Sequence, residues 1–157
     1  MKALDLLATE ENIYTTFIDD AIGRDADVFS FVSFLNSLDS GNVIALNARW
    51  GEGKTFFVKQ TKLVLEAFNP YYENIEHREE IKKTWEKLRK KQEIEIQPFV
   101  TVYYDAWMND NDEDPVLSLV LAILQNSKRR FGFIEGNTSI GKHKKSKRFG
   151  IEDSCVF

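Results

Sequence analysis

The stretch GEGKT at residues 51–55 constrains the fold of this chain more than any other sequence feature. The residues before it, 42–46 (NVIAL), form the short β-branched apolar run typical of a buried strand. After it, apolar side chains recur at three- and four-residue steps from Phe57 to Phe68, which predicts a helix. A strand, a glycine-rich turn ending in GKT and a helix, in this order, match the end of the phosphate-binding pattern GxxxxGK[ST].

The chemistry of anion binding explains these residue types. Glycines let successive backbone N–H groups turn inward around a phosphate, and the start of a helix adds partial positive charge. In this pattern Lys54 reaches the β- and γ-phosphates, and the hydroxyl of Thr55 binds Mg²⁺. The carboxylate of Glu52 would repel phosphate, so we expect it to point to solvent. The candidate nucleotide-binding residues are Trp50, Gly51, Glu52, Gly53, Lys54, Thr55 and Phe56.

One position departs from the pattern, because Ala48 stands where the first glycine belongs. If Ala48 had to adopt a positive φ, its methyl group would cost about 1 kcal/mol and weaken affinity up to about tenfold. The alternative interpretation of the stretch is an ordinary glycine-rich turn between strand and helix. The expected strand before the turn, the expected helix after it and the GKT residues between them together argue against this alternative.

The rest of the chain predicts an alternation of helices and strands. We expect a helix from about residue 26 to 38, a second strand from Phe99 to Tyr104, and an almost wholly apolar helix beginning at Pro115 and lying against the sheet. Residues 71–95 are dense in alternating charge, which predicts a charged helix that projects from the core. The fold class expected is therefore α/β with a parallel sheet.

Two segments resemble a known family, the KAP P-loop NTPases. Trp50 directly before the glycine turn is similar to the family's phosphate loop, GxWGxGK[ST], and residues 103–107 (YYDAW) are similar to its strand ending in Phe-Asn-Ala-Trp. The segment before the first strand is also similar, so the resemblance covers roughly residues 19–125. It implies a partial three-layer P-loop sandwich with a charged helical insertion at 71–95. It also implies ATP or GTP with Mg²⁺, and a family with members in bacterial anti-phage defence and signalling.

The chain departs from the family after residue 125, where no second apolar strand ending in paired acids follows. That strand would supply the metal-side and water-activating acids, so we expect nucleotide binding and leave hydrolysis open. Asp105 ends an apolar run and is a less favoured candidate metal ligand, because Ala106 and Trp107 match another strand of the family. Trp50 and Trp107 are expected to pack at the loop base and strand end rather than stack on a nucleobase.

Charge divides the chain into unlike parts. Residues 1–127 carry a net charge of −9, whereas residues 128–148 carry +7. We therefore expect a domain over 1–125 and a basic, flexible segment over 126–157, which is either a solvated tail or a contact for nucleic acid or an acidic partner. The absence of a long apolar run or a leader pattern, together with the single Cys155, favours a cytoplasmic protein without a membrane segment.

Two functional hypotheses remain open from the sequence. The first is a nucleotide-binding, N-terminal part of a KAP-like NTPase. The second is a truncated or degenerate P-loop protein that acts only as an interaction module. Besides the nucleotide, the partners that the sequence leaves open are a second copy of the chain or a missing C-terminal portion. His77 and His143 lack any metal-ligand spacing and are expected to be solvated.

Overall fold

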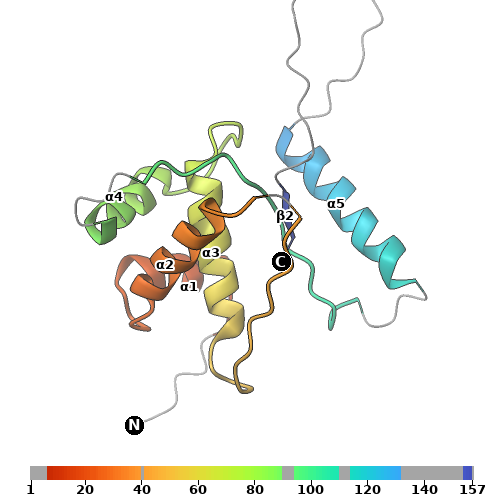
Figure 1. Cartoon of the computed structure of the whole chain (residues 1–157), viewed down its shortest axis with the longest axis horizontal. Helices are drawn as coiled ribbons and strands as arrows, with labels where there is room; N and C mark the ends of the chain where they lie inside the picture. Colours follow the sequence, from red (N-terminus) through yellow and green to blue (C-terminus); the bar gives the residue numbers. More distant parts are fainter. Residues whose placement is uncertain (1–6, 40, 90–93, 110–113, 132–153, 157) are drawn as a thin grey trace, which may run out of the picture.

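The computed structural model describes residues 7–39, 41–89, 94–109, 114–131 and 154–156 (Figure 1). Its helices are α1 (Glu10–Ile18), α2 (Asp25–Asn36), α3 (Lys54–Phe68), α4 (Arg78–Arg89) and α5 (Pro115–Phe131), and its strands are β1 (Val100–Val102) and β2 (Ser154–Val156). The expected helices at 26–38, after the GKT motif and after Pro115 are confirmed.

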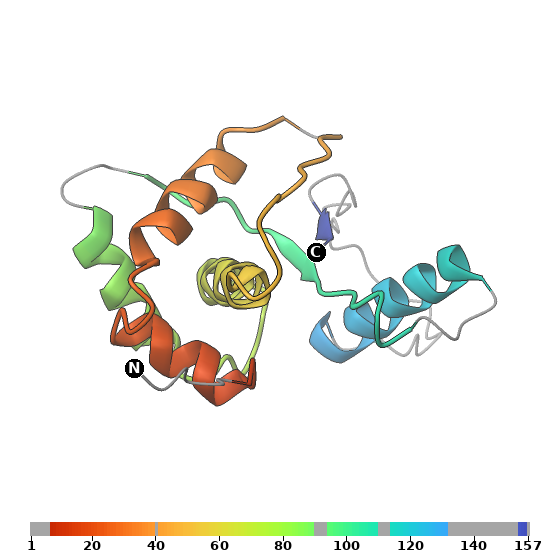
Figure 2. The same cartoon turned by 90° about the horizontal axis from the view of Figure 1, so that it is seen from below.

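The core is helical and is built around α3. Figure 2 shows α3 end-on, with α1, α2 and α4 arranged around it. These helices and the segment before β1 enclose a cluster of buried apolar side chains: Phe17, Val28, Val32, Leu35, Val64, Leu65, Ala67, Ile81, Trp85, Ile96 and Phe99. Burial of this apolar surface is the main stabilising term of the fold.

Helix α1 was not predicted from the sequence. The side chain of Thr9 caps it by accepting the backbone N–H of Asn12 at 3.2 Å, and two glutamates occupy its first turn, where the helix dipole favours negative charge. Ile13 and Phe17 are buried against the other helices. The helix is only nine residues long, so this packing supplies most of its stability.

Helix α4 is the charged helix expected within 71–95, but it does not project from the core. Ile81 and Trp85 on its thin apolar stripe are both 0% exposed. The ring of Trp85 lies 4.6 Å from that of Phe29 and 5.8 Å from that of Phe68. Its charged side chains remain outside, including an ion pair between Arg89 and Glu86. The apolar stripe therefore decided the position of α4, and the dense charge did not.

The prediction of a three-layer sandwich with a parallel sheet is wrong. The described residues form mainly helices, and their strand pairing is limited to the three-residue parallel ladder between β1 and β2, in which Thr101 lies opposite Cys155.

Side chains cover the other edge of β1. The backbone N–H of Thr101 donates to the hydroxyl of Tyr72 at 2.9 Å, and its carbonyl accepts the side-chain amide of Asn126 at 2.6 Å. The side-chain amide of Asn69 donates to the carbonyl of Phe99 at 2.6 Å. Polar side chains thus satisfy the backbone groups that a neighbouring strand would otherwise bond.

The expected buried strand at 42–46 is also wrong. This segment is extended but carries no strand assignment, and Val43 is 99% exposed. Ile44 and Leu46 are exposed as well. A β-branched apolar run becomes a buried strand only where a neighbouring strand bonds its backbone and another layer covers its side chains. Among the described residues, neither partner is present for this segment.

Helix α5 lies on the far side of β1 from α1–α4 (Figure 1). Its side chains from 115 to 126 are exposed or half-buried, so the prediction that it packs closely against a sheet is only partly correct. Within the ranges that the structure describes, no helix is both long and apolar enough to cross a membrane. Residues 132–153, which carry most of the expected basic segment, lie outside the described residues.

Candidate functional site

The backbone from Arg49 to Gly53 curls into a tight turn. Gly51 has φ +83° and Gly53 has φ +77°, both in the left-handed region where a side chain is strained. The N–H of Glu52 donates to the carbonyl of Arg49 at 3.3 Å, which closes the turn. Gly53 then caps α3, and its carbonyl accepts the N–H of Phe57 at 3.0 Å. The loop therefore leads directly into a helix N-terminus, which is suited to anions.

The side chain of Lys54 folds back over this turn. Its Nζ donates to the carbonyl oxygen of Ala48 at 2.6 Å and to that of Arg49 at 3.0 Å. These contacts hold a partly buried ammonium group against the loop instead of in an ion pair with a carboxylate. The cation is thus positioned beside the helix N-terminus, and breaking two bonds to carbonyls would free it for a phosphate.

Glu52 is exposed, as expected, but its carboxylate turns back on the loop. Oε2 accepts the backbone N–H of Arg49 at 2.9 Å. This bond orders the start of the loop. The N–H group that Glu52 accepts lies at the start of the loop. The carboxylate therefore does not compete with a ligand for the N–H groups at the start of α3.

Ala48 carries no strain. It is absent from the non-glycine residues with positive φ, which are Asp20, Asn74 and His77. The methyl group at this position therefore does not carry the cost that a left-handed conformation would impose.

The structure brings Trp50 of the loop and Trp107 of the segment after β1 into contact. Their ring centroids lie 5.9 Å apart at 83°, an edge-to-face pair. Trp50 is 86% exposed and Trp107 is 77% exposed. The expectation that they pack at the loop base and the strand end is corrected: both are exposed, and they contact each other on the surface.

Asp105 uses its carboxylate to order the turn after β1. Oδ1 accepts the backbone N–H of Trp107 at 3.1 Å, and Oδ2 accepts the hydroxyl of Tyr103 at 3.4 Å. Burial, together with the charge of Asp105, raises the pKa of Tyr103. Within the described ranges, no hydrogen bond or ion pair joins Asp105 to residues 51–55.

Thr55 and Phe56 occupy the first turn of α3, where Thr55 is exposed and Phe56 is half-buried. The hydroxyl of Thr55 is an oxygen donor of the kind Mg²⁺ prefers. In the part of the chain that the structure describes, no group of three His, Cys, Asp or Glu side chains is placed to hold a metal ion.

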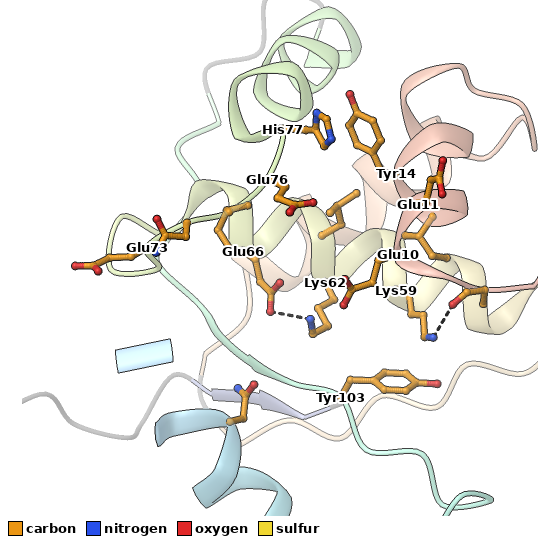
Figure 3. A pocket seen from close by; sticks show the side chains of 16 residues that line it. Glu10, Glu11, Tyr14, Lys59, Lys62, Glu66, Glu73, Glu76, His77 and Tyr103 are labelled. Atoms are coloured by element: carbon orange, nitrogen blue, oxygen red, sulfur yellow. Dashed lines mark hydrogen bonds and ion pairs between the residues drawn. The ribbon is translucent and has the colours of Figure 1, made fainter. Parts of the chain in front are cut away.

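A large open hollow of about 1050 Å³ lies away from the loop (Figure 3). Helices α1 and α3, the turn at 73–77, Tyr103 and Asn126 line it, and no residue from 50 to 56 does. His77 is exposed, as expected, and its ring also stacks on Tyr14 with ring centroids 4.1 Å apart. The hydroxyl of Tyr14 donates to Glu80, which raises the pKa of Tyr14 to about 12 and lowers that of Glu80. The hollow joins segments that lie far apart in the chain, so no local sequence pattern indicates it.

Comparison with known protein families gives a match that includes both the loop and β1. The family described as the KAP family P-loop domain matches residues 29–154. No curated protein and no solved structure matched the chain significantly. The matched range includes most of the chain, and the turn, the capping glycine and the folded-back lysine all lie within it. The chain therefore belongs to the KAP family of P-loop NTPase domains, whose common property is nucleotide binding.

Proposed function

We propose that residues 50–56 bind the triphosphate of Mg²⁺-ATP. The observation that carries this proposal is the position of Lys54: its ammonium group is held against the loop by the carbonyls of Ala48 and Arg49. A triphosphate offers a stronger acceptor than two neutral carbonyls, because its oxygens carry negative charge that attracts the ammonium group directly. Binding would thus exchange two loop contacts for contacts with phosphate.

Each candidate residue has a distinct role in this proposal. Gly51 and Gly53 allow the backbone to curl, and the N–H groups at the start of α3 bond phosphate oxygens. Thr55 supplies its hydroxyl to Mg²⁺, which would neutralise charge on the β- and γ-oxygens. Trp50 and Phe56 flank the glycines and shield the bound phosphates from water. Glu52 holds the start of the loop through the N–H of Arg49.

Asp105 is a weaker second candidate for the metal ion. Its carboxylate already accepts two hydrogen bonds within its own turn. The contact between Trp50 and Trp107 supports a position of this turn near the loop. A role through a bridging water fits this arrangement better than a direct bond to the metal.

The proposed biological role follows from family membership. A KAP-like domain would couple nucleotide binding, and hydrolysis where the required acids are present, to assembly or signalling, as in anti-phage defence. ATP is favoured over GTP by the same resemblance. We assign no catalytic base among the described residues, so binding is the activity proposed for them.

Calorimetric titration of the chain with Mg²⁺-ATP tests the site. Lys54→Ala is expected to abolish measurable binding, because it removes the ammonium group that is held against the loop. Lys87→Ala is the matched control, since it removes the same charge from an exposed position on α4. Unchanged affinity in Lys54→Ala would refute the assignment.

Thermal unfolding provides an independent readout. Ligand at about 100 times its dissociation constant stabilises a protein by about 2.7 kcal/mol. The parent chain and Lys87→Ala should both gain this stability, and Lys54→Ala should not. A chain that gains none with ATP or GTP would act as an interaction module instead. The structure weakens the interaction-module hypothesis, because α4 packs into the core and does not project as a charged helix that could contact a partner.

A further inference from the structure

Helix α5 presents two apolar faces, and within the described parts of the chain only one of them contacts other elements. At 100° per residue, five large aliphatic side chains fall within one arc of about 140°. All five are exposed: Val116, Leu117, Val120, Leu121 and Leu124. The opposite arc is half-buried and includes Asn126, which donates to the carbonyl of Thr101 in β1. A helix that is apolar on both faces normally lies between two layers.

The charges at the two ends of α5 are opposite. Four acids lie within residues 110–114 directly before the helix, and Lys128, Arg129 and Arg130 follow one another near its C-terminus. Between Pro115 and Ser127 the sequence carries no charge. If a second copy of α5 lay antiparallel to the first, the acidic N-terminal end of each helix would lie beside the basic C-terminal end of the other. A parallel arrangement would place like charges together.

We propose that α5 mediates a homodimer of this chain, in which the exposed arcs of two α5 helices pack antiparallel about a two-fold axis near Val120. A two-fold axis makes such a contact self-complementary, and positions equally far before and after residue 120 lie opposite each other. Val116 of one copy then lies opposite Leu124 of the other.

The exposed area predicts a weak dimer. The five side chains offer on the order of 400 Å² of apolar surface per copy, below the roughly 800 Å² per partner of a standard stable interface. We therefore expect a reversible dimer with a dissociation constant in the micromolar range, weakened by salt because charge pairing at the two ends contributes. This inference does not depend on the nucleotide site, and Lys54→Ala should leave the dimer unchanged.

Sedimentation equilibrium over a range of protein concentrations measures this dimer. Leu121→Glu should raise the dissociation constant at least about tenfold, because it buries a carboxylate in each half of an apolar contact. Phe34→Glu on α2 is the matched control, since Phe34 is 47% exposed and Leu121 is 46% exposed. A chain that stays monomeric at every concentration overturns the proposal, and so does a dimer that Leu121→Glu leaves intact.

Cysteine cross-linking tests the direction of the helices. The chain has a single cysteine, so Cys155→Ser provides a background free of thiols. In that background Val120→Cys should form a disulfide between two copies. Val116→Cys should not, because its two copies would lie about 12 Å apart along the helix axis, beyond the roughly 7 Å Cα separation that a disulfide spans.

A mixture of the Val116→Cys and Leu124→Cys chains completes the test. It should give the cross-linked heterodimer, because these two positions lie opposite each other in the antiparallel pair. Self-cross-linking of Val116→Cys as efficient as that of Val120→Cys would show parallel helices and overturn the proposed arrangement.

Discussion

At the residue scale, backbone conformation separates the two unusual positions of the loop. Gly53 adopts φ +77°, and a Cβ built on it would meet no atom within 4 Å. The requirement for glycine is therefore one of backbone angle and not of space. Ala48, where the sequence pattern has glycine, does not need the left-handed region. The departure from the pattern is thus harmless to the fold.

Two substitutions test this difference. Gly53→Ala should lower the free energy of unfolding by about 1 kcal/mol, because alanine is strained at positive φ. Ala48→Gly should not raise nucleotide affinity, because it relieves no strain. Urea unfolding and calorimetric titration of both variants measure these effects. A gain of about tenfold in affinity for Ala48→Gly would show that the methyl group obstructs the ligand.

Asp25 makes stability depend on pH. It is 4% exposed in the first turn of α2, and its backbone N–H donates to Oδ1 of Asp20 at 3.2 Å. Burial, and then the charge of Asp20, raises the pKa of Asp25 from 3.8 to about 7. Because the pKa of Asp25 is higher in the folded protein, the protonated carboxyl group stabilises the fold fully at pH values below the unfolded-state pKa of 3.8. This stabilisation is lost as the pH rises through the folded-state pKa of about 7.

Urea unfolding at pH 5 and pH 8 checks this dependence. Ionisation of Asp25 should lower the free energy of unfolding of the parent chain by on the order of 2 kcal/mol between pH 5 and pH 8. Asp25→Asn should remove that loss, because the amide stays neutral. Asp27→Asn, at an exposed position in the same turn, should keep it. If Asp25→Asn leaves the pH dependence unchanged, Asp25 is ionised in the folded protein at both values.

At the element scale, packing outweighs the charge pattern in α4. Trp85 is 0% exposed, and its Nε1 has no hydrogen-bond partner among the residues that the structure describes. Trp85→Ala should lower the free energy of unfolding by about 3–5 kcal/mol, the usual range when a buried tryptophan is truncated. Trp85→Phe should cost only about 1 kcal/mol, because loss of the unpaired N–H offsets part of the lost packing. Chemical denaturation measures both.

Trp107→Phe serves as the exposed control, since Trp107 is 77% exposed and its replacement should leave stability unchanged. A cost below about 1 kcal/mol for Trp85→Ala would indicate that α4 does separate from the core in solution.

At the scale of the whole molecule, the chain has two parts of unequal packing. Helices α1–α4 enclose the buried cluster, whereas the described side chains of α5 are at most half-buried. The side-chain amide of Asn126 links α5 to the carbonyl of Thr101. A helix held by few buried contacts opens locally at low free-energy cost.

Hydrogen exchange should therefore show α5 exchanging faster than α3. Asn126→Ala should increase exchange in α5 further and leave α3 protected, because it removes the bond to Thr101. Gln125→Ala, at the neighbouring exposed position, should change neither helix. Equal protection of α3 and α5 would contradict this division into two parts.

Local pattern determined the loop and several helices of this protein. The GKT motif placed the start of α3, and apolar periodicity located α2, because both features depend on neighbouring residues alone. The candidate site was visible for the same reason: Gly51, Gly53 and Lys54 lie within four consecutive positions. The contact between Trp50 and Trp107 and the bond from the Arg49 N–H to Glu52 are visible only in the three-dimensional structure.

Only the tertiary structure decided which apolar segments are buried. Residues 42–46 and α5 are as apolar as any core segment, yet Val43 and Leu121 face solvent, whereas the charged α4 buries Trp85. Burial depends on what lies opposite a segment, and that partner comes from elsewhere in the chain or from another molecule. The sequence by itself thus determined local conformation and the chemistry of the loop. Long-range pairing, which no local pattern encodes, decided the sheet and the core.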